Sequence, residues 1–297
     1  MGEIRYLHRE KGTIENELVY GGRWLRLVYE NPVGKPILWT LAKRAWFSRW
    51  YGRRMDKNSS KAKIKPFIAQ YNLNEDEFET KPENFNSFND FFSRKLKLSA
   101  RPITQDEKSA VFPADGRHLG FPCISTTDGI FVKGQKFNLP ELFQSKELSK
   151  PYFNGSLVLS RLCPVDYHRF HFPVDGIISD NSLLNGSLFS VNPIALRKNL
   201  GIVWHNKRYL SFLDTKRFGK VAQFLIGATF VGSVTITCPF QKEVKKGDEF
   251  GFFSFGGSSV LTLFEKGRIT LSEDLVSSSR KGMEMYAKVG DEMGQMN

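Results

Sequence analysis

From residue 101 onward, short apolar runs alternate with Gly, Pro, Asn and Asp residues that favour turns. Runs such as GSLVLSRL, VAQFLIGATFVGSVTIT and SSVLTLF are rich in residues that suit strands. We therefore expect residues 101–297 to form a β-rich domain of mainly antiparallel short strands. This domain is the candidate catalytic domain, because it contains most of the motifs with reactive side chains.

The residues before this domain follow a helical period. In residues 61–100, Phe88, Phe91 and Phe92 recur at helical spacing, and Ser87 is a candidate helix cap. This pattern predicts a helical region whose phenylalanines belong to a core rather than to a site. The fold class expected for the whole chain is α+β, with a helical N-terminal region followed by the β-rich domain.

Residues 1–60 are rich in tryptophan and basic residues. The segment KPILWTLAKRAWFSRWYGRRMDK contains three of the five tryptophans of the chain, Trp39, Trp46 and Trp50, among lysines and arginines. Tryptophan beside cations is typical of a helix at a membrane interface. The alternative is a helix packed on the protein with its charges in water. We interpret residues 1–60 as a membrane-docking segment.

Composition narrows the classes of partner. The net charge of +12 suits nucleic acid, an anionic lipid surface or an acidic substrate, and does not choose among them. The three cysteines, Cys123, Cys163 and Cys238, form no C-x-x-C pair, which argues against a disulfide framework or a structural zinc site. The polar start and the lack of a spanning apolar run predict a soluble or membrane-surface protein.

Two glycines and two serines interrupt the aromatic run FGFFSFGGSSVLTLF. Glycine is unfavourable inside a strand, so this step is either a bend or a reaction site. The Ser258 hydroxyl could attack the carbonyl carbon of Gly257, given an unusual backbone geometry and a base. A conventional nucleophile elbow, G-x-S-x-G, is disfavoured because Val260 stands where its second glycine would be.

The partners for Ser258 are sought among the histidines and acids of the same domain. His168 and His171 lie in DYHRFHFP, and Asp115 lies in FPADG. Such residues can converge in a fold although they are far apart in sequence. The alternatives are structural histidines, a metal-binding H-x-x-H pair, and an ordinary Asp-Gly turn. Metal is disfavoured, because no further His or Cys cluster lies near the pair.

Taken together and in order, several motifs resemble those of the phosphatidylserine decarboxylases over residues 72–297, roughly: FNDFFSRKLKLSARPI, FPADG, DYHRFHFP, SVNPIAL and FGGSSV. The resemblance implies a zymogen that cleaves itself between Gly257 and Ser258 into a β chain, 1–257, and an α chain, 258–297. It implies that Ser258 becomes a covalent pyruvoyl group, the cofactor, which forms a Schiff base with the substrate amine.

The resemblance also implies roles for the candidate residues. Asp115, His171 and Ser258 would form the charge relay for cleavage, and His168 would serve decarboxylation as the acid that protonates the product carbon. The reaction would convert phosphatidylserine to phosphatidylethanolamine in phospholipid biosynthesis, with no metal.

A lipid substrate implies an anionic membrane surface as partner, and a peripheral location on the cytoplasmic face of the cell membrane. Each Lys or Arg near such a surface contributes about 1 kcal/mol to the free energy of membrane binding. The basic segment 36–54 is therefore the expected docking element. The β and α chains would stay associated, and the protein could form a homo-oligomer.

Three other functions stay open on the residues alone. A pyruvoyl-dependent decarboxylase of a soluble amino acid would have no use for the basic tryptophan segment. A non-catalytic β-rich binding or carrier module is suggested by the similar turns KGDEFG and VGDEMG, but a suitably displayed lysine is missing. Nucleic-acid binding would rest on the net charge alone, without a recognisable reading motif.

Overall fold

A computed structural model describes residues 4–17, 52–126, 137–191, 193–196, 199, 201–227, 234–256 and 258–297. The tryptophans of the expected docking segment, Trp39, Trp46 and Trp50, lie outside these residues. Gly257 also lies outside them. Among the described residues, no helix has the length and apolar character needed to cross a membrane.

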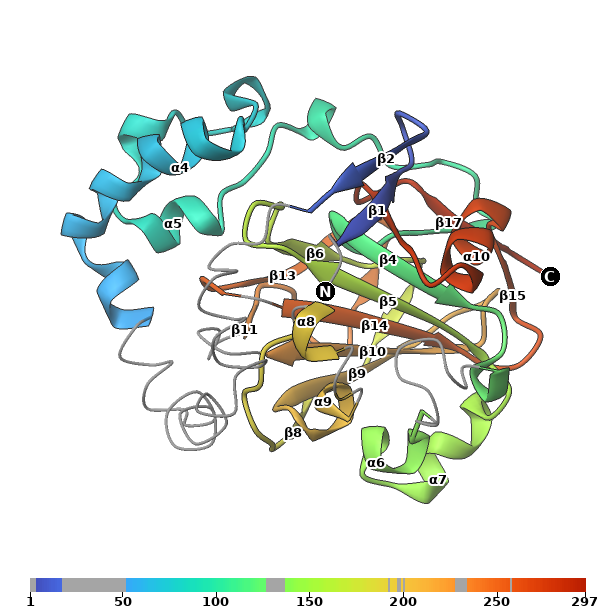
Figure 1. The fold of residues 1–297 in the computed structure, drawn as a ribbon. Coiled ribbons are helices and arrows are strands. Elements are labelled where there is room, and N and C mark those ends of the chain that lie inside the picture. Colours follow the sequence, from blue (N-terminus) through green and yellow to red (C-terminus); the bar gives the residue numbers. More distant parts are fainter. Residues whose placement is uncertain are drawn as a thin grey trace.

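A large sheet of eleven strands forms the centre of the described structure (Figure 1). Ten of its strands run in the order β12 (Glu243–Val244), β7 (Gly176–Ile178), β9 (Arg208–Asp214), β10 (Lys220–Gly227), β14 (Ser258–Phe264), β5 (Ser156–Leu162), β4 (Gly116–Phe121), β16 (Glu284–Ala287), β1 (Arg5–His8) and β2 (Thr13–Asn16). The remaining strand, β8 (Ser182–Leu184), pairs with β9. Every pairing is antiparallel except that of β1 with β16.

Two smaller antiparallel sheets and several short helices complete the described fold. The small sheets are β11 (Val234–Ile236), β13 (Glu249–Phe253) and β6 (Arg169–His171), and β15 (Ile269–Leu271), β17 (Glu292–Met296) and β3 (Ser109–Val111). The α-helices are α4 (Ile64–Tyr71), α5 (Phe88–Phe92), α6 (Leu139–Phe143), α7 (Lys146–Ser149), α8 (Pro193–Leu196), α9 (Ile202–His205) and α10 (Glu273–Arg280). The expected α+β class, with a large and mainly antiparallel sheet, is confirmed. The expected division into a helical N-terminal region and a β-rich domain stays a prediction.

Strand β14 is the best-buried part of the large sheet. All seven of its residues are buried. Val260 and Phe264 belong to one hydrophobic core, and Leu261 and Leu263 belong to a second core. Because successive side chains point to opposite faces of a sheet, the alternation places one core on each face. This two-sided burial explains why β14 reads as a nearly continuous apolar run.

The region between residues 52 and 100 contains helical residues 52–56, α4, α5 and short 3-10 turns. Helix α5 begins after Ser87, whose side chain accepts a hydrogen bond of 3.1 Å from the Asp90 backbone N–H. Phe88, Phe91 and Phe92 are buried in a third core, as their spacing predicts. Phe255 belongs to the same core, so the helices pack on the chain just before Ser258.

The N-terminal residues differ from the expectation of a docking segment that extends from residue 1 to 60. Residues 5–16 form the β1–β2 hairpin, and β1 pairs with β16 near the other end of the chain. The first strands therefore belong to the large sheet (Figure 1). The segment RYLH lacks a long apolar run, and its pairing partner lies some 280 residues away, which is why the pattern gave no signal.

Candidate functional site

Ser258 is the first residue of β14 and lies in the middle of the large sheet. It pairs with Leu162 of β5 on one side and with Gly227 of β10 on the other. Its side chain is fully buried, and its hydroxyl has no hydrogen-bond partner among the described residues. Gly256, two residues earlier, has a φ of 141°, a backbone conformation that favours glycine. Strand β14 thus begins with a buried hydroxyl that has no hydrogen-bond partner among the described residues, two residues after a backbone conformation that favours glycine.

His168 lies in a dry environment next to this turn. Its ring lies against that of Phe92, with a centroid distance of 3.8 Å and an angle of 38° between the ring planes, and it is fully buried. Its Nδ1 is 2.9 Å from the Asp166 carbonyl oxygen, so Nδ1 carries the proton and donates it. Burial lowers the pKa of His168 to about 3, although the backbone of Asp166 and Gly256 acts in the opposite direction. At neutral pH the ring is therefore neutral, with a lone pair on Nε2.

His171 has the same tautomer in a different setting. Its Nδ1 is 2.9 Å from the Gly247 carbonyl oxygen and donates to it, while Nε2 has no partner among the described residues. Burial is the main cause that lowers the pKa of His171, and the nearby Glu249 and Asp115 charges oppose it. A neutral imidazole with a free Nε2 lone pair is the form that a general base requires.

Asp115 is fully buried at the start of β4. Its carboxylate accepts hydrogen bonds of 2.7–3.0 Å from Arg101, and one of 2.8 Å from the Val289 N–H. The following Gly116 has no room for a side chain, because a Cβ there would lie 2.5 Å from the Arg161 carbonyl oxygen. This close approach of β4 to β5 fixes the position of Asp115.

The fold brings the loop of Asp115 alongside His171, because the His171 N–H donates to the Pro113 carbonyl at 2.7 Å. It does not join the three predicted relay residues by direct hydrogen bonds within the described structure: Asp115 is bound by Arg101, and the imidazole of His171 is bound by Gly247. The Asp115 carboxylate acts on His171 through its charge.

Sequence reasoning missed the buried charges around these residues. Arg117 donates to Asp166 at 2.6 Å, and Asp166 in turn accepts from the Cys163 N–H at 2.6 Å. Arg161 donates to Glu17 and Glu284. No local pattern marks Arg117 or Arg161 as buried, because their acidic partners are far away in the sequence. Among the described residues, no group of three His, Cys, Asp or Glu side chains is placed to hold a metal ion.

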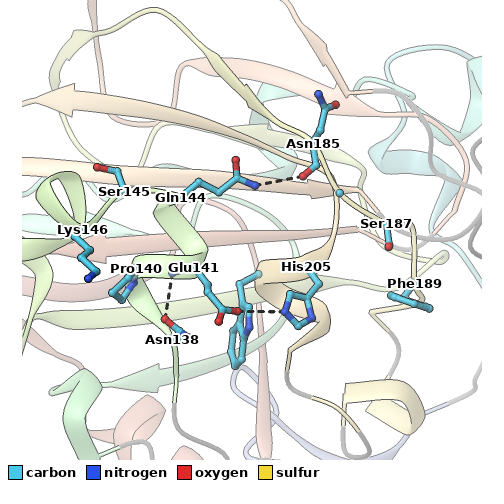
Figure 2. A pocket seen from close by; sticks show the side chains of 12 residues that line it. Asn138, Pro140, Glu141, Gln144, Ser145, Lys146, Asn185, Ser187, Phe189 and His205 are labelled. Carbon is cyan, nitrogen blue, oxygen red and sulfur yellow. Dashed lines mark hydrogen bonds and ion pairs between the residues drawn. The ribbon is translucent and has the colours of Figure 1, made fainter.

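An open pocket lies elsewhere in the molecule (Figure 2). It has a volume of about 940 Å³ and lies between α6, α9 and residues 185–189. In its lining, the Nε2 of His205 lies 3.2 Å from the Oε2 of Glu141, and both side chains are about half exposed. None of the predicted site residues lines it, so this pocket is separate from the candidate site.

The described structure combines a β-rich fold with a fully buried serine at the start of a central strand and two histidines whose Nε2 atoms have no hydrogen-bond partner among the described residues. A model of the phosphatidylserine decarboxylase family matches residues 88–295. The chain belongs to this family.

Curated relatives match almost the whole chain. The phosphatidylserine decarboxylase proenzyme of Fusobacterium nucleatum is 43% identical over 98% of this chain and 97% of its own length. The proenzyme of the same description from Clostridium novyi is 42% identical over 98% of this chain and 99% of its own. The proenzyme of the same description from Chlamydia muridarum is 42% identical over 99% of this chain and 97% of its own length.

Proposed function

We propose that this chain is a proenzyme that cuts itself between Gly257 and Ser258 and then decarboxylates phosphatidylserine to phosphatidylethanolamine. The observation that carries the proposal is the buried hydroxyl of Ser258 at the start of β14, which has no hydrogen-bond partner among the described residues. The family of the chain and the proenzyme descriptions of its relatives support the same reaction.

In the cleavage step, the Nε2 of His171 takes the proton of the Ser258 hydroxyl, whose oxygen attacks the carbonyl carbon of Gly257. The peptide becomes an ester at the serine oxygen. Elimination across Cα–Cβ of Ser258 releases the β chain with a C-terminal carboxylate, and hydrolysis of the remaining dehydroalanine releases ammonia. The negative charge of Asp115 favours the imidazolium that forms on His171.

The position of Ser258 suits a pyruvoyl group, because the side chain is fully buried at the start of a central strand that holds it in place. When present, a pyruvoyl group supplies a conjugated carbonyl that serves as an electron sink for the carbanion left after CO2 departs. We assign His168 the proton transfer to the product carbon. Its Nε2 starts as a lone pair, so it takes a proton from the substrate ammonium and later delivers it to the product carbon.

The substrate is a lipid, and we place the protein at the cytoplasmic face of the cell membrane as a peripheral protein, docked through residues 36–54. The basic and tryptophan-rich composition of that segment supports this part of the proposal.

Intact-mass analysis tests the cleavage. The purified protein should consist of two chains that divide before Ser258, the smaller without a free amine at its start, and it should release CO2 from phosphatidylserine vesicles. Ser258→Ala should remain one chain of 34.0 kDa without activity. A wild-type chain that stays intact, or a cleaved chain that acts on free serine but not on phosphatidylserine, would contradict the proposal.

A further inference from the structure

A charged cavity of about 620 Å³ lies between the β1–β2 hairpin, residues 71–78 and the residues that precede His168. Five carboxylates and five Lys or Arg side chains line it. Four of the five cations have a carboxylate partner within 4 Å. The pairs are Arg101 with Asp115 and Glu77, Arg117 with Asp166, Lys11 with Glu15, and Lys288 with Glu10.

Arg94 is the remaining cation, and it has no carboxylate partner among the described residues. Its side chain is 5% exposed, and its Nε and Nη1 have no hydrogen-bond partner there. The guanidinium lies over the rings of Phe78 and Phe91, at 5.1 Å and 4.9 Å from their centroids. Burial lowers its pKa to about 10, which leaves it charged at neutral pH. Asp115 and Asp166 act on Arg94 through their charges, without an ion-pair contact to it in the described structure. Buried donors without partners are costly, and an anion in the cavity would satisfy the Nε and Nη1 of Arg94.

The cavity wall offers a second donor beside Arg94. Tyr167 lines the same cavity as Arg94, and burial raises the pKa of Tyr167, so its phenol keeps its proton at neutral pH. Its hydroxyl makes no hydrogen bond within the described structure, so it is available to a ligand. A planar guanidinium and a phenol O–H together suit a tetrahedral anion such as a phosphodiester.

The cavity is next to the reacting residues. Asp166 and Tyr167 line it and immediately precede His168. Asp166 also holds the N–H of Cys163, which follows the Leu162 that pairs with Ser258. The charge of Arg94 is one of the causes that lower the pKa of His168, which places the guanidinium within electrostatic reach of that ring.

We propose that Arg94, with Tyr167, binds the phosphodiester of the phosphatidylserine head group, an inference that rests on the proposed function. The substrate has a second anionic group, its carboxylate, but that group leaves as CO2. A guanidinium on the carboxylate would stabilise the ground state and oppose the reaction, whereas a guanidinium on the phosphodiester holds the non-reacting part of the substrate in place.

Two soluble probes separate the two anions. Glycerophosphoglycerol has a phosphodiester but no carboxylate or amine, and N-acetylserine has a carboxylate but no phosphate or free amine. Their binding to the cleaved wild-type protein and to Arg94→Met is measured by ligand-observed NMR titration. Loss of a charged hydrogen-bonding partner should weaken glycerophosphoglycerol binding about 10- to 100-fold and change N-acetylserine binding less than twofold.

Turnover gives an independent readout with short-chain phosphatidylserine. Arg94→Met should raise KM at least tenfold and keep kcat within threefold, because the interaction is made equally before and during the reaction. The matched control is Lys288→Met, which removes one positive charge from the same cavity, but a charge that already has Glu10 as its partner. This control should leave both KM and probe binding within twofold of wild type.

Several outcomes would overturn the inference: unchanged glycerophosphoglycerol binding in Arg94→Met, a selective loss of N-acetylserine binding, or inorganic phosphate that binds tenfold more tightly than glycerophosphoglycerol. If Arg94→Met fails to fold, Arg94→Lys serves, and a loss of less than threefold counts against the inference. A wild-type protein that binds glycerophosphoglycerol through Arg94 but releases no CO2 would refute the proposed function and leave the anion site standing.

Discussion

At the scale of single residues, two histidines three positions apart have the same protonation state and different surroundings. A backbone carbonyl holds Nδ1–H in each, so each has a lone pair on Nε2. His168 lies against Phe92 in a fully buried position, whereas His171 lies on β6 beside the loop of Asp115. We infer that this segment, in which His168 directly precedes β6 and His171 ends it, places one imidazole for each chemical step.

Substitution of each histidine tests this division. His171→Ala should block cleavage, because it removes the base for the Ser258 hydroxyl. His168→Ala should be cleaved normally but lose about 10²- to 10⁴-fold in kcat, the usual contribution of general acid–base catalysis. Cleavage is read by intact mass and kcat by CO2 release. His205→Ala, in the separate pocket of Figure 2, is the control and should change neither. Normal turnover by His168→Ala would contradict its assigned role.

The pKa values of the buried histidines predict the pH dependence of stability. Burial lowers the pKa values of His168 and His118 to about 3 each, below the ordinary value of 6.5 that applies when the chain unfolds. Between pH 3 and pH 6.5 the unfolded chain therefore binds more protons than the folded chain. The stability present above pH 6.5 should fall as the pH is lowered, by about 1.4 kcal/mol per pH unit for each histidine.

Urea unfolding at pH 5.0, 5.5 and 6.0 measures this slope. The Ser258→Ala protein is used as the reference, so that one intact chain unfolds. Adding His118→Gln should reduce the slope by about 1.4 kcal/mol per pH unit, whatever it does to the stability itself. An identical slope in both proteins would show that His118 titrates in the folded state as an ordinary histidine does.

At the scale of elements, the β1–β2 hairpin connects the start of the chain to the buried charges of the site. Glu17 follows β2, is 2% exposed, and accepts hydrogen bonds from Arg161 at 2.5 Å and 3.2 Å. It also lies 3.5 Å from Arg117. The charges of Arg161 and Arg117 lower the pKa of Glu17 to about 2 against the opposing effect of burial.

Removing Glu17 should therefore destabilise the protein strongly. Glu17→Ala leaves two buried arginines short of one carboxylate, for which we expect a loss of about 3 kcal/mol. Glu10→Ala, in the same hairpin, removes a carboxylate that is 68% exposed beside Lys288, and it should cost less than about 1 kcal/mol. The free energy of unfolding in urea, again in the Ser258→Ala protein, distinguishes the two. Equal losses would mean that the buried network does not stabilise the fold.

Sequence patterns predict the elements whose signal is local. One such element is β14, which an apolar run next to turn residues predicts. Another is α5, which is predicted by the Ser87 cap and by the helical spacing of Phe88, Phe91 and Phe92. The β1–β2 hairpin is not such an element, because its strand β1 is defined by pairing with the distant β16. For the site, sequence motifs indicate Ser258 and the histidines. Only the three-dimensional structure shows that Arg94 is buried and that its Nε and Nη1 have no hydrogen-bond partner among the described residues. Charge pairing depends on tertiary contacts, which no spacing along the chain records.

At the scale of the whole molecule, the proposed cut would fall inside a continuous structure. The α chain would contribute β14 between β5 and β10, β16 between β4 and β1, and β17 beside β3. Each of these neighbours belongs to the β chain. The cleaved protein would thus remain one folded body held by interstrand hydrogen bonds and two shared hydrophobic cores.

Docking to the membrane is the remaining property of the whole molecule. Triple substitution of Trp39, Trp46 and Trp50 by Ala should weaken sedimentation with phosphatidylserine-containing liposomes, because these side chains would lie at the interface. Self-cleavage should proceed as in wild type, since the substituted residues are outside the candidate site. Unchanged sedimentation would remove this segment from the docking role.

The position of Ser258 in the backbone of a central strand limits how such an enzyme could be maintained. On the proposed function, its reactive carbonyl would be made once from the polypeptide itself and could not dissociate or be reloaded. A copy inactivated by a carbonyl reagent such as hydroxylamine could be replaced only by new synthesis. The rate at which the cell makes this cofactor would then be set by the rate at which it translates this protein, and no vitamin would be needed.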